Sequence, residues 1–384
     1  MVVLIVIISL SILIFFHEFG HFIVSKVFHV KVEEFGFGYP PRIFGFVKVK
    51  NKRRFFLGKN IPKEKDLGTI YSLNWIPFGG FNKLKEAKDE NEMTEDSLEG
   101  KKWWQKALIA VAGAGMNIFL TFLLFFFLFY IGPKQIITPE MSGLKIRESQ
   151  IVVASILKGA PADKAGLKIS DIILEIDNKK VKTVKDVQDY LKDKANKTVT
   201  LKIKRKNKVL NLKVTPVSGE KIYPDQKFKK AVIGVVLAKM GRVSYPFFQA
   251  IKKAFIRTTS LFKQIIIGLA IFLKKLIFEH KVIGEAIGVV GLAALTKEAT
   301  ELGFGYLINF LAIISLLIAI TQLIPFPALD GGHLVFYLIE GIRKKPISIR
   351  VVNLINNIGF IILMALMIFL TYRDILRLVL KKSF

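Results

Sequence analysis

Hydrophobic residues in this chain are gathered into four long stretches, which are separated by segments rich in charged residues. The stretches cover residues 2–24, 107–131, 306–324 and 355–372. Each is close to the roughly 20 apolar residues that a helix needs to cross a bilayer. The sequence therefore predicts a multi-span α-helical membrane protein with about four transmembrane helices.

The first apolar stretch lies where a cleavable signal peptide would also lie. It has no basic segment before the apolar run and no small-residue cleavage site after it. It leads directly into FFHEFGH at residues 15–21. We therefore expect it to be retained as the first transmembrane helix.

Residues 244–300 have a mixed pattern, in which Lys and Arg recur at helical intervals among apolar residues. A helix with one basic face and one apolar face is suited to the membrane interface. We expect an amphipathic interfacial helix here, and a fifth transmembrane helix is the alternative.

Within residues 29–106, the stretch 30–61 alternates apolar and polar positions and contains Gly and Pro, which is typical of strands and turns. Residues 76–84, with the sequence IPFGGFNKL, form a second extended piece that Gly79 and Gly80 interrupt. We expect a β-rich, membrane-associated insert. Its strands either pair with an extended substrate by β-augmentation or simply cap the membrane domain.

Residues 151–216 alternate strands with a short helix near residues 184–192. Within them, GAPADKAGLKISDIILEIDNKKV at residues 159–181 is similar to the PDZ domains of bacterial membrane and periplasmic proteases. The resemblance implies a groove that binds extended chains or C-termini by strand addition. We expect one PDZ-like α+β domain over residues 140–243.

The orientation in the membrane follows from the charge of a short loop. Residues 341–350 carry four basic residues and no acidic one, which predicts a cytoplasmic loop. With four transmembrane helices, residues 29–106 are then also cytoplasmic, and the PDZ-like domain is extracytoplasmic. The predicted location is the cell (inner) membrane. The predicted segments are 1–28 (transmembrane), 29–106 (cytoplasmic hairpin and loop), 107–131 (transmembrane), 140–243 (PDZ-like), 244–300 (interfacial), 303–325 (transmembrane, with LDGG after its apolar run) and 351–373 (transmembrane).

The net charge and the cysteine content limit which partners and which site chemistry the chain can have. The 384 residues include 58 Lys and Arg against 30 Asp and Glu, a net charge of +28, and no Cys. The basic residues are spread over every polar segment without aromatic interleaving, so we expect contacts with anionic membrane lipids and not with nucleic acid. The absence of Cys excludes disulfides, thiolate metal ligands and a Cys nucleophile.

His17, Glu18 and His21 form an H-E-x-x-H motif at the end of the first apolar stretch. Positions four apart share one face of a helix, so both imidazoles can bind one zinc ion while Glu18 acts as the general base. Ionisable residues inside a membrane segment are costly and usually functional. The chain has only 5 His, so two at this spacing around a Glu argue against coincidence.

A second cluster follows the third apolar stretch, in TQLIPFPALDGGH at residues 321–333. Pro325 and Pro327 cannot continue a helix, and broken backbone at membrane depth is tolerated where it lines a cavity. A catalytic zinc has three protein ligands and an open position for water. Asp330 is the expected third ligand, and His333 is the alternative. Asp330 could instead be a surface residue at a helix end that the two glycines cap.

Together these motifs resemble the site-2 protease family of intramembrane zinc metalloproteases, in particular bacterial members with a PDZ domain. The resemblance implies that Asp330 is the third ligand of Zn2+. It also implies an endopeptidase that cleaves single-span membrane proteins, such as anti-sigma factors or remnant signal peptides, after a first cut by a site-1 protease. The matching segments are FFHEFGH (15–21), PFGGF (77–81), AGAGMN (112–117), the PDZ-like segment and PFPALDGG (325–332).

The chain departs from the family pattern in three places, one of which is IGEAIGVVG at residues 283–291, where the family has a Gly-Gly-Pro-like motif. Gln322 stands where the family usually has Asn, and the second apolar stretch lacks the motif's Pro but keeps Asn117. We expect activity with an altered fit to the substrate. The predicted substrate-binding residues are Gln322, Asn117, Gly79, Gly80 and Phe81.

A different class of function is a non-catalytic, PDZ-containing membrane scaffold with a structural zinc site. Structural zinc is closed by four protein ligands, whereas this sequence offers three candidates and a free Glu18. A zinc transporter would place further His or Asp residues inside its transmembrane helices. The motif therefore favours an enzyme.

Overall fold

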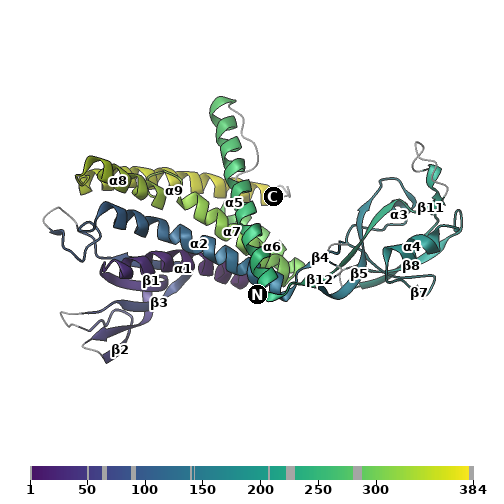
Figure 1. Cartoon of the computed structure of the whole chain (residues 1–384), viewed down its shortest axis with the longest axis horizontal. Helices are drawn as coiled ribbons and strands as arrows, with labels where there is room; N and C mark the ends of the chain where they lie inside the picture. Colours follow the sequence, from purple (N-terminus) through teal and green to yellow (C-terminus); the bar gives the residue numbers. More distant parts are fainter. Residues whose placement is uncertain are drawn as a thin grey trace. The chain divides into compact units, whose positions relative to one another are not determined.

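The structure is a computed structural model that describes residues 2–49, 52–62, 67–87, 92–138, 141, 143–205, 208–221, 230–279 and 288–379. The chain forms two compact units, shown in Figure 1. One unit comprises Met1–Phe126 and Lys252–Phe384, and the other comprises Phe127–Ile251. The second unit is thus an insertion into the first.

The first unit is mainly helical, because its sequence supplies long apolar runs. Its helices are α1 (Val2–Val27), α2 (Trp103–Ile131), α5 (Phe247–Phe278), α6 (Val289–Leu302), α7 (Phe304–Gln322), α8 (Asp330–Arg343) and α9 (Ile349–Val379), where α2 and α5 extend into the second unit in sequence. Figure 1 shows α1, α2 and α7 running alongside one another.

Among the described residues, five helices are long and apolar enough to cross a membrane, one more than the four predicted. Four of them, α1, α2, α7 and α9, match the predicted transmembrane stretches. The fifth covers Phe247–Phe272 of α5, where we expected an interfacial helix. Its mean hydropathy of 1.4 is the lowest of the five, because Lys and Arg interrupt its apolar residues. Residues 280–287 of that predicted segment lie outside the described residues.

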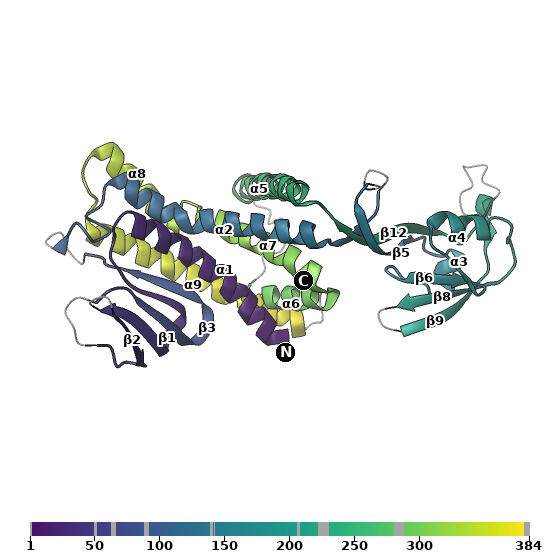
Figure 2. The ribbon, with the colours of Figure 1, turned by 60° about the horizontal axis from the view of Figure 1, so that its bottom comes forward.

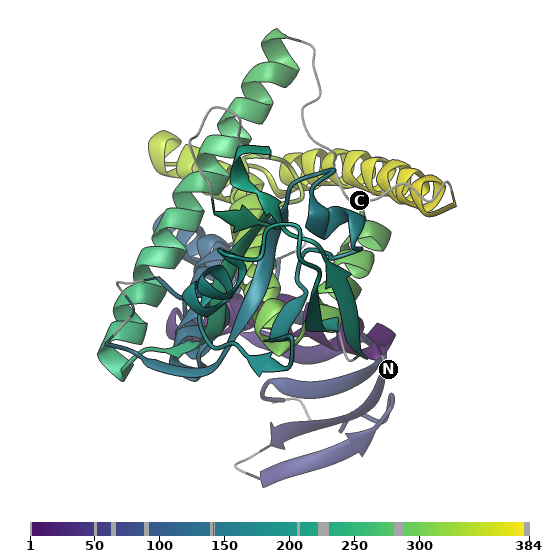
Figure 3. The ribbon, with the colours of Figure 1, turned by 90° about the vertical axis from the view of Figure 1, so that its right-hand side faces the viewer.

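Helix α5 differs from its neighbours in direction. Figure 3 shows α5, in green, along its full length, and in Figure 1 it lies steeply across α2 and α7. Its side chains from Lys252 onward remain largely exposed, and only 11% of the residues in its most apolar stretch are buried. Helix α5 therefore has an apolar surface that the described residues do not cover.

Helix α2 is antiparallel to both α1 and α7. Leu13 of α1 packs beside Leu120 and Ile314, and about two turns further along α1 a Cβ on Gly20 would lie 2.3 Å from the carbonyl oxygen of Ala112. The hydroxyls of Thr121 and Ser315 link α2 to α7. Helices α1 and α7 consequently run in the same direction.

A three-stranded antiparallel sheet in the order β2-β1-β3 lies beside α1, as Figure 2 shows. Its strands are β1 (Val32–Val49), β2 (Lys52–Leu57) and β3 (Ile70–Leu84). Strand β3 approaches α1 through two glycines: a Cβ on Gly79 would lie 2.5 Å from Ile14, and one on Gly80 would lie 3.1 Å from Phe15. The predicted extended piece is thus part of β3, and its Gly pair is the point of contact with the helix.

The second unit is built on a seven-stranded antiparallel sheet in the order β4-β12-β5-β6-β8-β9, with β7 paired to β6. The predicted short helix is α4, which Thr183 and Asp186 begin with a capping box. Buried aliphatic residues, including Ile151, Ile173 and Leu201, form the core. The elements are β4 (Lys134–Ile136), β5 (Lys145–Ile156), α3 (Pro161–Lys164), β6 (Ile172–Ile176), β7 (Lys179–Lys180), α4 (Val184–Leu191), β8 (Val199–Arg205), β9 (Lys208–Val214), β10 (Val217–Ser218), β11 (Ala231–Val232) and β12 (Val235–Ser244).

Candidate metal centre

Two histidines and one aspartate meet inside the helical unit. The Nε2 atoms of His17 and His21 on α1 lie 3.2 Å apart. An Oδ2 oxygen of Asp330, the first residue of α8, lies 3.0 Å from Nε2 of His17 and 3.2 Å from Nε2 of His21. Three potential ligand atoms from positions 17, 21 and 330 thus converge on one point.

The spacing of these atoms fits a zinc ion. Ligand atoms that are 2.0–2.2 Å from a tetrahedral zinc lie about 3.3–3.6 Å from one another. The observed separations of 3.0–3.2 Å are only slightly shorter. Two imidazole nitrogens and a carboxylate oxygen are also a donor set of catalytic zinc sites, which leave a fourth position for water.

The turn between α7 and α8 delivers Asp330 to this point. Helix α7 ends at Gln322, and the chain folds back so tightly that a Cβ on Gly331 would lie 2.3 Å from the carbonyl oxygen of Ile324. A Cβ on Gly332 would lie 2.4 Å from the carbonyl oxygen of Phe326. Both glycines are therefore needed at the start of α8, and they do not form the C-terminal cap that was the alternative for this segment.

The histidine rings are held from behind by α2. Nδ1 of His21 lies 2.8 Å from the carbonyl oxygen of Ile109, to which it can only donate. Nε2 of the neutral ring is then left with a lone pair for a metal, which is the usual arrangement of histidine ligands. Behind His17, the side-chain nitrogen of Asn117 lies 3.5 Å from Nδ1.

Gly113 provides the space for both rings. A Cβ on this residue would lie 2.4 Å from Nε2 of His21 and 2.6 Å from Cε1 of His17. Any side chain at this position would occupy the place of the ligand atoms. The sequence motif AGAGMN was recognised, but sequence reasoning did not identify Gly113 as part of the site, because its role depends on the crossing of α1 and α2.

Glu18 lies on a different face of α1 from the two histidines and is turned toward β3. Its carboxylate accepts a hydrogen bond from the backbone N–H of Asn82. In the sheet, Asn82 is opposite Phe35 of β1, whose ring packs at a tilt against the Phe rings of α1. The general base predicted from the motif is thus held between its own helix and β3.

The predicted substrate residues occupy three different environments. Gly79 and Gly80 are buried against α1, and Phe81 stacks on Tyr39 with ring centroids 6.2 Å apart. Gln322 is partly buried at the end of α7, and its Oε1 has no hydrogen-bond partner among the described residues. Asn117 is fully buried. Its side chain is therefore enclosed next to His17 and is not presented to an incoming chain.

His333, the alternative third ligand, lies one turn after Asp330 but belongs to another contact. Its Nε2 atom lies 3.3 Å from the side-chain nitrogen of Asn356 on α9. The metal-ligand group in the described part of the chain contains Asp330 and not His333. Asn356 also accepts a hydrogen bond from the backbone N–H of Ala328, so it ties the turn to α9.

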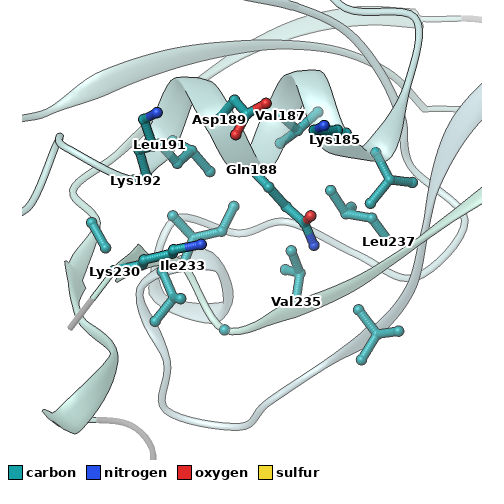
Figure 4. A pocket seen from close by; sticks show the side chains of 15 residues that line it. Lys185, Val187, Gln188, Asp189, Leu191, Lys192, Lys230, Ile233, Val235 and Leu237 are labelled. Carbon is teal, nitrogen blue, oxygen red and sulfur yellow. The ribbon is translucent and has the colours of Figure 1, made fainter. Parts of the chain in front are cut away.

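The second unit contains a groove between α4 and the start of β12, drawn in Figure 4. Its volume is about 710 Å³. Strand β12 pairs with β5 from Val235 onward, and Gln188 of α4 points toward this strand in Figure 4. Three lysines, Lys185, Lys192 and Lys230, belong to the groove lining. An extended peptide fits between a helix and a strand edge of this kind.

Comparison with known proteins identifies the family of this chain. The sequence model of peptidase family M50 matches residues 5–57 and 47–366. A Clostridium perfringens protein with the name "Putative zinc metalloprotease" is 32% identical, and the alignment covers 98% of this chain and 99% of that protein. Proteins with the same name from Helicobacter pylori J99 and Agrobacterium fabrum are 30% and 29% identical, over 98% and 97% of this chain and 99% and 95% of their own lengths.

Two solved structures are similar to a part of the chain. The PDZ domain of an SdrC-like protein from Listeria monocytogenes is 24% identical, with 24% of this chain and 93% of that chain covered and a TM-score of 0.21. The corresponding domain from Listeria innocua is 26% identical, with 23% and 92% covered and a TM-score of 0.20.

The predicted resemblance to site-2 proteases and the predicted enzyme class are confirmed, because the family match extends over most of the chain. The names of the relatives agree with the prediction that the metal is zinc. The apolar helices agree with a multi-pass membrane protein. Over nearly its whole length, then, this chain belongs to peptidase family M50, and the match includes the three candidate metal ligands His17, His21 and Asp330.

Proposed function

We propose that the protein is an intramembrane zinc metalloprotease that hydrolyses peptide bonds within or near the transmembrane segments of single-span membrane proteins. The observation that carries this proposal is the position of the metal-ligand group. His17 is 4% exposed within an apolar helix, and Asp330 lies at the end of the short turn that follows another apolar helix. A site built from such helices is accessible to a substrate that is itself in the membrane.

The number of ligands supports an enzyme over the scaffold alternative. The group in the described residues contains three ligand atoms, whereas a structural zinc site is closed by four. Glu18 lies beside this group and is not one of its members. Its carboxylate is therefore free to take part in proton transfer.

The residues of the chain have distinct tasks in hydrolysis. Zinc, when bound by His17, His21 and Asp330, would polarise both the attacking water and the peptide carbonyl. Glu18 accepts the proton of the attacking water and then transfers it to the leaving amine. Strand β3 contacts the Glu18 carboxylate through the backbone N–H of Asn82.

Strand β3 supports a route for the substrate. A helical substrate must be unwound before its carbonyl groups become accessible, because they are engaged in its own hydrogen bonds. The segment of β3 from Gly79 to Asn82 lies against α1 next to Glu18. We propose that an unwound substrate is bound in extended form near this segment, with Phe81 and Gln322 among its contacts.

The direction of the helices supports four transmembrane helices with α5 at the interface. Since α1 and α7 run in the same direction and α2 runs in the opposite one, α2 and α7 are two successive crossings. Helix α7 therefore starts on the side of the membrane on which α2 ends. If α5 also crossed the membrane, one more crossing would be needed between α5 and α7 to return the chain to that side. Helix α6 has 14 residues, about 21 Å, which is shorter than the roughly 30 Å hydrocarbon core.

The charge of one loop supports an orientation of the protein in the membrane. The basic loop after α8 favours a cytoplasmic position for the end of α7, and thus for the metal centre and for β1 to β3. The PDZ-like unit follows α2 and is accordingly extracytoplasmic. We propose the cell (inner) membrane as the location, with membrane lipids around the apolar helices.

The groove between α4 and β12 supports a docking role for the PDZ-like unit. Its basic rim is suited to the carboxylate of a free C-terminus, such as a preceding site-1 protease would produce. Anti-sigma factors and remnant signal peptides are the substrate classes that the family resemblance implies. The unit would then select substrates without contributing to the chemical step.

The test is cleavage of a tagged single-span substrate by purified protein in detergent, with wild type beside Glu18→Gln. We expect both proteins to contain zinc and only wild type to cut, with a loss of about 10²-fold or more in the variant. If Glu18→Gln retains full activity, the proposed role of Glu18 is wrong. If neither protein cuts any single-span substrate although both contain zinc, the scaffold alternative is favoured.

A further inference from the structure

Asn117 is a completely enclosed polar residue beside the metal-ligand group. It is 0% exposed, and it is located on the turn of α2 that lies behind His17. Its backbone carbonyl oxygen accepts hydrogen bonds from the hydroxyls of Thr121 and Ser315, both at 2.9 Å. These contacts fix the backbone of Asn117 against α7, so its side chain is directed from a rigid position.

The side-chain amide of Asn117 is in contact with one functional atom. Its nitrogen lies 3.5 Å from Nδ1 of His17, while its oxygen, Oδ1, has no hydrogen-bond partner among the described residues. The two ends of an amide side chain are assigned from the hydrogen bonds around them, and a 180° rotation exchanges them. The protonation of His17 decides which end must face Nδ1.

A metal on Nε2 settles that protonation. A neutral imidazole that binds a metal through Nε2 carries its proton on Nδ1, which is then a donor. The NH2 group of Asn117 is also a donor, so it cannot pair with Nδ1–H. With the amide rotated, Oδ1 accepts from Nδ1–H, and the buried oxygen gains the partner that it lacks.

We infer that Asn117 is a positioning residue for His17, whose amide oxygen accepts the Nδ1–H hydrogen bond and so holds Nε2 toward the metal. This inference rests on the proposed metal site. It gives both histidines the same arrangement, because the carbonyl oxygen of Ile109 accepts from Nδ1 of His21 in the same way. It also replaces the substrate-binding role predicted for Asn117, which is incompatible with its complete burial.

The inference is tested by the zinc affinity of full-length protein in detergent, measured by competition with a chromophoric chelator. Asn117→Leu has a similar volume but no acceptor, and we expect a 10- to 100-fold loss of zinc affinity. Asn117→Asp keeps an acceptor and loses the donors, so we expect it to retain affinity within about threefold of wild type. The absorption spectrum of bound Co2+ should be altered in Asn117→Leu and close to wild type in Asn117→Asp.

Gly115→Ala is the matched control, because it changes the same stretch of α2 at an exposed position where a Cβ would meet nothing within 4 Å. We expect it to bind zinc like wild type. Equal affinity in wild type and Asn117→Leu would overturn the inference, and so would an Asn117→Asp variant as weak as Asn117→Leu. Since these measurements do not use proteolysis, they can succeed in a protein that cuts no substrate, and then only the proposed function fails.

Discussion

Gly113 on α2 and His21 on α1 are so close that a Cβ on the glycine would lie 2.4 Å from Nε2 of the histidine. The contact defines how closely the two helices cross at the metal-ligand group. Two residues further along α2, Gly115 is exposed, and a Cβ there would meet nothing within 4 Å. Of the two glycines in the AGAGMN motif, Gly115 therefore has space for a side chain and Gly113 has none.

We expect Gly113→Ala to abolish stoichiometric zinc binding and peptidase activity, because the new methyl group would occupy the space of the ligand atoms. Gly115→Ala should bind zinc and cut like wild type, since Ala is favoured over Gly in a helix by about 1 kcal/mol and meets no neighbour here. Zinc content after dialysis measures both. A zinc-loaded, active Gly113→Ala protein would show that the crossing of α1 and α2 is wider than the structure has it.

The two alternatives for the third ligand can be separated by substitution. We expect Asp330→Ala to lose zinc, because it removes the only carboxylate oxygen in the described ligand group. His333→Ala should retain zinc, because His333 contacts Asn356 instead. The measurement is metal content by mass spectrometry of the purified variants. If Asp330→Ala retained zinc and His333→Ala lost it, His333 would be the third ligand instead of Asp330.

The β1–β3 sheet contains a buried carboxylate whose ionisation should affect stability. Glu34 is 5% exposed and accepts hydrogen bonds from Nε of Arg42 and from the hydroxyl of Ser72, both at 2.6 Å. Burial alone would raise the pKa of Glu34, but the hydrogen bonds from Arg42 and Ser72 outweigh it, and the pKa is lowered.

A lowered pKa in the folded state means that ionised Glu34 stabilises the protein above its ordinary pKa of about 4.3. That contribution is lost as the pH falls through the lowered value. We expect wild type to exceed Glu34→Gln in thermal stability at pH 7 and the difference to shrink below about pH 4. Melting of both proteins in detergent over this range is the test, and a difference that grows on acidification would contradict it.

Two arginines of the PDZ-like unit form ion pairs of different burial. Arg205 donates from Nε and from a terminal nitrogen to Asp171, at 2.7 and 2.6 Å, and Asp171 is 0% exposed. Arg205→Ala should lower the stability of this unit by about 3 kcal/mol, because it leaves a buried carboxylate unpaired. Arg242→Ala, whose partner Glu148 is exposed, should cost less than about 1 kcal/mol. The two variants are compared by hydrogen exchange of β6 and β8 in the full-length protein. Equal loss of protection in both variants would contradict the prediction that the buried ion pair contributes more.

Filling the groove of the PDZ-like unit should alter substrate choice. We expect Gln188→Trp, an exposed position that points toward β12, to reduce cleavage of substrates with a free C-terminus outside the membrane. Cleavage of a minimal transmembrane substrate should not change. Lys208→Trp, exposed on β9 and outside the groove lining, is the control. An identical profile for both variants and wild type on every substrate would exclude docking in this groove.

Local sequence determined the parts of this protein that depend on neighbours along the chain. The apolar runs predicted α1, α2, α7 and α9, since a helix satisfies its own backbone in lipid whatever surrounds it. The H-E-x-x-H spacing put His17 and His21 on one face of a helix, because that geometry is internal to the helix. The third ligand could be placed only by resemblance, and spacing alone left His333 open.

Tertiary structure decided everything that depends on how two helices cross. The close approach of α1 and α2 gives Gly113 its role and encloses Asn117 behind His17, whereas the sequence predicted a substrate-binding role for Asn117 and no role for Gly113. The fold of the turn at Gly331 and Gly332 brings Asp330 to the two histidines, more than 300 residues away in sequence. Such contacts arise from the packing of distant segments, which periodicity along one segment does not encode.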